Sequence, residues 1–139
     1  MPTITLKDIS RRYIEGVGRR KTAIARVRIV PGGTGVFLVN NMPWDKYFVT
    51  IDMQKAARDP FDITGTWGQF DVSVKVLGGG AHSQAGAVKL GVARALVKNE
   101  ESMRKILRDT GMMTRDPRKK ERKKPGLKRA RKAPQWQKR

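Results

Sequence analysis

The distribution of charge along the chain limits which part of it can fold on its own. The 139 residues carry 31 Lys or Arg and 12 Asp or Glu, a formal net charge of +19. Residues 115–139 hold 13 of the basic residues and 2 acids, and their only large apolar side chains are Leu127 and Trp136. Such a segment buries too little apolar surface to offset the entropy of ordering. We therefore expect a folded body over residues 1–114 and an extended basic tail over residues 115–139, which is ordered only against an anionic partner.

Composition also narrows the class of protein. With an isoelectric point of about 11.2, the chain suits a polyanionic partner, and nucleic acid is the first candidate. Cysteine is absent and His82 is the single histidine, so we expect no disulfide, no bound metal and no cofactor. The first residues, MPTITLKDISRRY, lack the apolar core of a secretory signal, and no apolar run approaches the ~20 residues that cross a bilayer. A cytoplasmic protein without a membrane partner is the expectation.

Two segments of the body alternate with the period of a β-strand. In residues 22–30, apolar side chains at 23, 25, 27 and 29 share one side, and Arg26 and Arg28 share the other. Residues 31–35, PGGTG, have the chemistry of a turn, so residues 36–39 are predicted to return as the second strand of a hairpin. Residues 71–77 form another strand, with Val72, Val74 and Val76 inward. Asn40 and Asn41 end the predicted hairpin.

Helical periodicity follows the strand predicted at residues 71–77. Residues 83–98 are predicted to form a helix capped by Ser83, and small residues at 87, 91 and 93 let it approach a sheet closely. A shorter helix capped by Asn99 points Met103, Ile106 and Leu107 inward and ends at Gly111. The expected fold class is α+β, a small mixed sheet covered by helices.

Residues 40–69 give a weaker pattern. We interpret residues 44–48 and 53–58 as short helical turns, with a break at Asp59 and Pro60 and a further strand near Ile63. The aromatic side chains here lie among apolar neighbours and not in a basic stripe, so they favour a core or lid over base stacking. These residues are Trp44, Tyr47, Phe48 and Phe61.

The first candidate binding surface in the body is basic. Three consecutive cations, Arg19, Arg20 and Lys21, precede the strand on which Arg26 and Arg28 continue the stripe. A row of cations on one strand face fits a phosphate backbone. A solvated edge strand protected from aggregation would explain Arg26 and Arg28, but not the triplet.

The second candidate is the glycine-rich link GGGAHSQAG, residues 78–86. Glycines before a helix expose backbone N–H groups to an anion, but the link matches neither a dinucleotide fingerprint nor a P-loop. Two interpretations stay open: a tight turn with close packing, or contact of Gly79 and Gly80 with a phosphate of structured RNA. The acids show no catalytic spacing, so we expect no enzyme; the alternative is an enzyme that uses this link on a phosphorylated substrate.

The basic tail carries the third candidate. Asp116 and Pro117 could begin one or two helical turns, and Pro125 with Gly126 would stop them. An extended strand threading between RNA phosphates suits the charge, although a flexible arm that binds any polyanion would also explain it. The predicted RNA ligands are Arg115, Arg118, Lys119, Lys120, Arg122, Lys123, Lys124, Lys128, Arg129, Arg131 and Lys132. At the end, the Trp136 ring can stack while Lys138 and Arg139 reach a phosphate beyond it.

Several motifs in order resemble the bacterial small-subunit ribosomal protein nine family. They are GRRKTAIARV at 18–27, GGG at 78–80, QAGA at 84–87, ARAL at 93–96, TRD at 114–116 and ERKKPGLKRARKAPQWQKR at 121–139. Between residues 40 and 69, only Tyr47 and Phe48 match that family's pattern. The alternative outside this family is an architectural nucleic-acid-binding protein that acts away from the ribosome.

The resemblance implies a structural constituent of the small ribosomal subunit, with a body like the second domain of ribosomal protein five. It implies binding to ribosomal RNA in the subunit head, beside neighbouring head proteins. The basic tail would run to the peptidyl site, where Lys138 and Arg139, with Gln137 and Trp136, would meet the transfer RNA. The family usually has Phe at the position of Trp136 and often Ser at that of Gln137, so the hydrogen bonding of Gln137 is left open.

Overall fold

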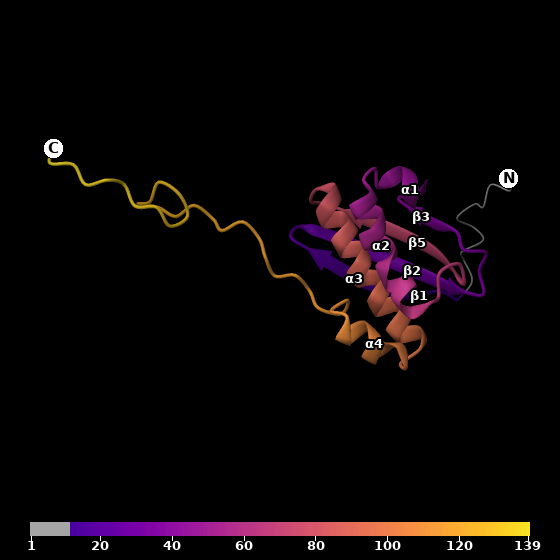
Figure 1. Cartoon of the computed structure of the whole chain (residues 1–139). Helices are drawn as coiled ribbons and strands as arrows, with labels where there is room; N and C mark the ends of the chain where they lie inside the picture. The colour runs from indigo at the N-terminus through magenta and orange to yellow at the C-terminus, as the bar shows by residue number, and fades with distance from the viewer. Residues whose placement is uncertain (1–11) are drawn as a thin grey trace.

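The computed structural model describes residues 12–139; residues 1–11, which the sequence analysis assigns to the body, lie outside the described residues. A sheet forms one layer, and the helices cover one of its faces (Figure 1). Helix α3 packs on β1 and β2, α2 packs on α3, and α4 lies against both helices. The elements are β1 (Ile14–Arg20), β2 (Ala23–Pro31), β3 (Phe37–Val39), β4 (Met42–Pro43), α1 (Trp44–Tyr47), α2 (Ile51–Thr64), β5 (Phe70–Leu77), α3 (Ala81–Asn99) and α4 (Met103–Asp109).

The sheet is mixed, with the strand order β1-β2-β5-β3-β4. Strand β2 pairs antiparallel with β1 and β5, whereas β3 runs parallel to β5. The two alternating patterns form the central strands as predicted, because every second side chain of β2 and β5 is buried against the helices. The predicted α+β class with a small mixed sheet is confirmed.

The predicted hairpin of β2 with residues 36–39 is wrong. Strand β5 occupies the place beside β2, and β3 pairs with β5. The carboxylate of Asp71 draws the intervening loop to the start of β5, since its Oδ1 accepts hydrogen bonds from the Thr34 and Val36 N–H groups at 2.8 and 3.1 Å. Asn40 extends the pairing through two side-chain bonds of 3.0 Å to the backbone of Val76. The hairpin that forms joins β1 to β2, and β1 was not predicted from the sequence.

The break predicted at Asp59 and Pro60 is wrong, because helix α2 continues through both residues. It runs through Pro60, which is buried with Ala57 and Phe61, and it ends at Gly65, whose φ of 66° is left-handed. Ile63 lies in this helix and not in a strand. Burial of one face of the helix therefore outweighs the backbone bond that proline cannot make. Helix α1 confirms the turn predicted at 44–48, and the four aromatic side chains lie in or against the core as predicted.

Helix α3 begins at Ala81 with Gly80 as N-cap, so Ser83 is not the cap but a buried residue within the first turn. The predicted close approach to the sheet is confirmed. A Cβ atom added to Gly91 would lie 2.6 Å from Cγ2 of Val27, and one added to Gly16 would lie 2.7 Å from the backbone N of Ala95. Strand and helix are in backbone contact because these positions carry no side chain.

Helix α4 begins after Ser102, three residues later than the predicted cap at Asn99. Leu107 is fully buried and Met103 packs against the core, but Ile106 is 50% exposed, so its predicted inward position is wrong. The helix ends before Gly111 as predicted, and Met112 N–H bonds the Leu107 carbonyl at 2.9 Å. Asp116 caps no helix, because residues 110–139, all of them described, contain neither helix nor strand. From there the chain runs away from the sheet and helices (Figure 1).

Candidate nucleic-acid interface

Arg20, the last residue of β1, lies across the start of α3. Strand alternation places it on the same side as Gly16 and Gly18, facing the helix. A Cβ atom on Gly86 would overlap Cδ of Arg20 and lie 3.0 Å from its Nη1. The guanidinium donates to the His82 carbonyl at 3.4 Å. Gly86 thus leaves the space in which Arg20 is held, a role that sequence reasoning missed.

Asp116 lies between two guanidinium groups. Its Oδ2 is 3.6 Å from Nη2 of Arg20 and 2.9 Å from Nη2 of Arg118. Its Oδ1 accepts from Nε and from the backbone N–H of Arg118, both at 3.0 Å. These bonds from Arg118 hold the pKa of Asp116 well below its usual range, with a further contribution from Arg20, and the same pair raises the pKa of Arg118. The carboxylate therefore stays ionised in neutral solution.

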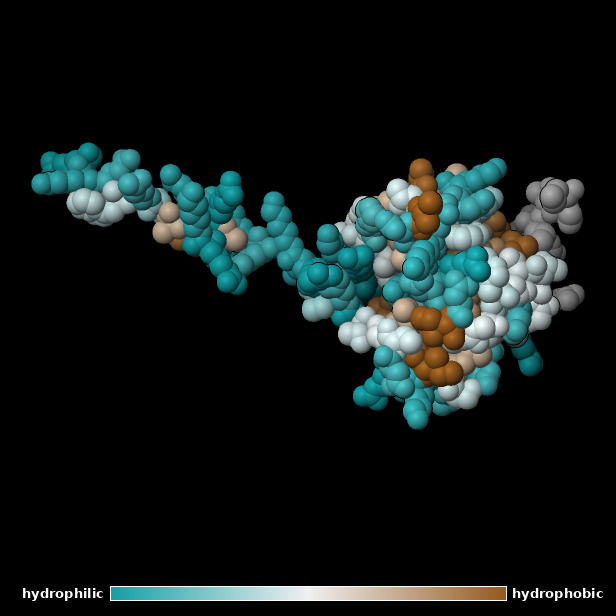
Figure 2. Space-filling view, viewed as in Figure 1, coloured by the Kyte–Doolittle hydropathy of each residue, from teal (hydrophilic) through white to brown (hydrophobic). Residues whose placement is uncertain are grey.

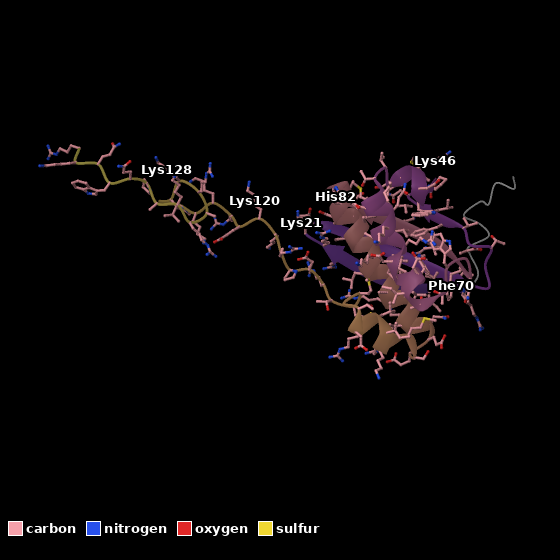
Figure 3. The ribbon with its side chains drawn as sticks, in the orientation of Figure 1. Lys21, Lys46, Phe70, His82, Lys120 and Lys128 are labelled. Atoms are coloured by element: carbon pink, nitrogen blue, oxygen red, sulfur yellow. The ribbon has the colours of Figure 1, made fainter. Side chains whose placement is uncertain are left out.

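Two adjoining hollows meet at Arg20 and Asp116, and we call them together the basic hollow. One lies between the end of β1, α3 and the residues after α4; the other lies between the β1–β2 turn and the start of the basic tail. Their lining contains seven basic residues against one acid, Asp116. The basic residues are Arg19, Arg20, Lys21, Lys89, Arg118, Lys119 and Lys120. In Figure 3, Lys21 lies at the tip of the sheet on the side toward which the segment carrying Lys120 leaves the body.

Arg26 and Arg28 belong to a different surface, because they lie on the sheet face opposite α3. Both share one carboxylate: Glu15 Oε1 is 3.1 Å from Nε of Arg26, and its Oε2 is 3.7 Å from Nε of Arg28. The Arg28 guanidinium also covers the Tyr13 ring at 4.5 Å. The predicted single stripe is therefore wrong for Arg20, which faces α3, whereas strand alternation places Arg19 on the same face as Arg26 and Arg28. Glu15 was missed because only the pairing of β1 with β2 brings it beside these arginines.

The glycine link is explained by packing at two of its positions. Gly78 and Gly79 have φ values of 74° and 66°. A Cβ on Gly78 would lie 2.6 Å from the Thr22 carbonyl, and one on Gly79 would lie 3.1 Å from Cβ of Ala23. Gly80 has no neighbour within 4 Å of such an atom. The turn interpretation thus accounts for Gly78 and Gly79, while phosphate contact by Gly79 and Gly80 stays a prediction.

The basic tail contains one local loop. Glu121 pairs with Lys124 at 2.6 Å and with Arg131 at 2.9 Å, and the Lys128 N–H bonds the Lys132 carbonyl at 2.8 Å. The surface of the tail is hydrophilic along nearly its whole length (Figure 2). Every predicted RNA ligand in it is exposed, as are Gln137, Lys138 and Arg139. The Trp136 side chain is 81% exposed.

The chain from residue 12 onward has neither a cluster of metal-binding side chains nor a membrane-spanning helix. Within that range, no three His, Cys, Asp or Glu residues lie close enough together to hold a metal ion. No helix in the same range is both long and apolar enough to cross a bilayer.

Comparison with known proteins decides the family. Residues 18–139 match the family described as Ribosomal protein S9/S16. The chain belongs to that family. The small ribosomal subunit proteins uS9 of Dehalococcoides mccartyi strains BAV1 and CBDB1 are each 50% identical to it over 127 residues, which are 91% of this chain and 96% of theirs. The uS9 protein of strain 195 is 47% identical over the same length. As an S9/S16 protein, the chain is a structural ribosomal protein and not an enzyme, which removes the catalytic interpretation of residues 78–86.

Proposed function

We propose that this protein is a structural constituent of the small ribosomal subunit that binds ribosomal RNA through the basic hollow and the basic tail. The observation that carries the proposal is the basic hollow itself, because its lining includes seven basic residues against one acid and continues into the exposed cations of the tail. Membership of the S9/S16 family and the uS9 names of its relatives agree with this role. The protein would act in the cytoplasm, on the ribosome.

RNA phosphates are the partner that the hollow fits. Its cations come from β1, α3 and the tail, so a folded RNA backbone that follows the hollow neutralises charges from all three segments. Each neutralised phosphate contributes a slope of about −0.7 to −0.9 in log K against log salt. Arg26 and Arg28 form a second surface on the other face of the sheet, where Glu15 neutralises part of their charge. Specificity would come from RNA shape, since phosphate contacts carry no sequence information.

The basic tail would bind as an extended, RNA-threading segment distinct from the body of residues 1–114. Its exposed cations and its lack of helix or strand support this division. The body would share the fold of the second domain of ribosomal protein five and lie in the subunit head beside other head proteins. The RNA ligands in the tail would be the cations predicted from the sequence, from Arg115 to Lys132.

The last residues of the tail would contact transfer RNA at the peptidyl site. Lys138 and Arg139 would pair with its phosphates, with Gln137 beside them. The exposed Trp136 ring would stack on RNA and hold the end in register, because no other part of the described chain covers it.

Two truncations test this division of labour. Deletion of residues 137–139 should leave incorporation into small subunits nearly intact but weaken transfer-RNA retention. Deletion of residues 115–139 should impair incorporation as well, because it removes more than half of the net charge. If the short deletion blocked incorporation as severely as the long one, the proposed roles would be wrong. Tight binding to duplex DNA, without co-sedimentation with small subunits in moderate salt, would instead support an architectural protein outside the ribosome.

A further inference from the structure

Asp116 connects the basic tail to the folded body. Two acids lie after Thr114, and Glu121 pairs only with Lys124 and Arg131, both within the tail, in the described ion pairs. Asp116 instead reaches Arg20, on β1. The Asp116 side chain is 27% exposed, against 82% for Arg118. This carboxylate is thus the more enclosed member of the pair, at the junction between body and tail.

Both ends of this connection are held in place. On the tail side, the backbone and the guanidinium of Arg118 bond the same carboxylate, and the intervening Pro117 has a restricted φ. On the body side, Arg20 lies over Gly86 and donates to the His82 carbonyl. An ion pair between two fixed groups limits the orientations of the chain more than one between two mobile side chains.

We propose that Asp116 is a positioning residue that ties the chain to Arg20 and sets the direction in which residues 117–139 leave the body. A tail held in one direction presents its cations along one line, so less orientational freedom is lost when a polyanion binds. This gain in binding rests on the proposed function, but the fixed direction does not, because it is a property of the free protein.

Net charge is the competing explanation for any effect of Asp116. Removing one acid from a strongly basic segment increases repulsion throughout, whichever acid is removed. The Glu121→Gln variant is the matched control, since it removes the same charge from the same tail without touching Arg20. The Asp116→Asn variant keeps the shape of the side chain and loses the charge.

The experiment measures the distance between body and tail in the full chain. The protein has no cysteine, so Lys55→Cys on α2 and Lys120→Cys in the tail accept two spin labels without competing sites. Double electron–electron resonance gives the distance distribution at about 0.01 M and at about 0.15 M salt, because the screening length for exposed charges falls from roughly 30 Å to roughly 8 Å between them. Circular dichroism confirms that each variant is folded.

The parent chain should give a narrow distance component that Asp116→Asn and Arg20→Gln each abolish. The double variant should be no broader than either single variant, because both remove the same link. Glu121→Gln should keep the narrow component. A broad parent distribution, or equal broadening by Glu121→Gln, would overturn the proposal. If the distances behave as expected but the chain does not bind small-subunit RNA, the link stands and the proposed function fails.

Discussion

Replacing Gly18 by alanine tests the glycine at which an added Cβ would come nearest to a neighbouring atom. Gly18 lies in β1 opposite α3, and an added Cβ would overlap the carbonyl oxygen and carbon of Ala87. Both neighbours are backbone, so no side chain can rotate away and the strand and helix must move apart. Such a separation also opens the contact of Gly91 with Val27. The structure therefore predicts a loss of packing along the whole line where α3 crosses β1.

The expected cost is at the upper end of the range for overpacked cores, about 3 kcal/mol. Domains of this kind are stable by ~5–15 kcal/mol, so Gly18→Ala should fold but unfold readily. At roughly 4–8 °C per kcal/mol, the melting temperature should fall by about 12–24 °C. Thermal unfolding followed by far-ultraviolet circular dichroism measures the change.

The matched control is Gly80→Ala, where an added Cβ meets no atom within 4 Å and φ is −97°. As an N-cap change from glycine to alanine, it should cost less than about 1 kcal/mol. If Gly18→Ala melted within about 4 °C of this control, the inferred backbone contact between β1 and α3 would be wrong.

Three smaller predictions concern the charged surfaces. Gly86→Ala should change stability by less than about 1 kcal/mol, because an added Cβ displaces the Arg20 side chain and no backbone, yet weaken binding to small-subunit RNA about tenfold through loss of one charged contact; an unchanged affinity in a filter-binding assay would argue against a role for Arg20. Glu15→Gln should cost less than about 1 kcal/mol by urea unfolding and raise RNA affinity at low salt, since Arg26 and Arg28 lose their shared acid; weaker binding would contradict this. Because the pKa of Asp116 is lowered, its link is fully present above the ordinary value of 3.8 and is lost only as the pH falls through the lower folded value. The distance between labels at positions 55 and 120 should therefore not change between pH 8 and pH 5, and a change in that range would refute the pairing.

Local patterns in the sequence predicted the elements that bury one complete face. Strands β2 and β5 and the small residues of α3 follow directly from periods of two and 3.6 residues. Strand β1 gave no such signal, because Gly16 and Gly18 are required by the helix that crosses them and not by the strand itself. The partner of β3 depends on Asp71 and Asn40, which act across 35 or more residues of sequence. A local sequence pattern therefore does not show which strand β3 pairs with.

For the candidate site too, the sequence indicated which residues take part but not how they are arranged. Apart from Lys89, the basic residues of the hollow and of the tail were identified one by one from the sequence, and comparison confirms the family that their motifs resemble. Their arrangement was not identified, because Arg20, Gly86 and Asp116 come from three distant segments. A carboxylate in a basic run also gives no sign of which cation it contacts. Only the fold shows that Asp116 reaches back to β1, whereas Glu121 closes a loop within the tail.

The most direct test of the proposed function is a crosslink from the end of the basic tail in assembled small subunits with transfer RNA bound. A photoreactive residue at position 137 would lie beside Lys138 and Arg139. A crosslink to the anticodon stem-loop of the peptidyl-site transfer RNA is expected, and it should be lost when Lys138 and Arg139 alone are deleted. Crosslinks to protein alone, or none because this end points into solvent, would contradict it.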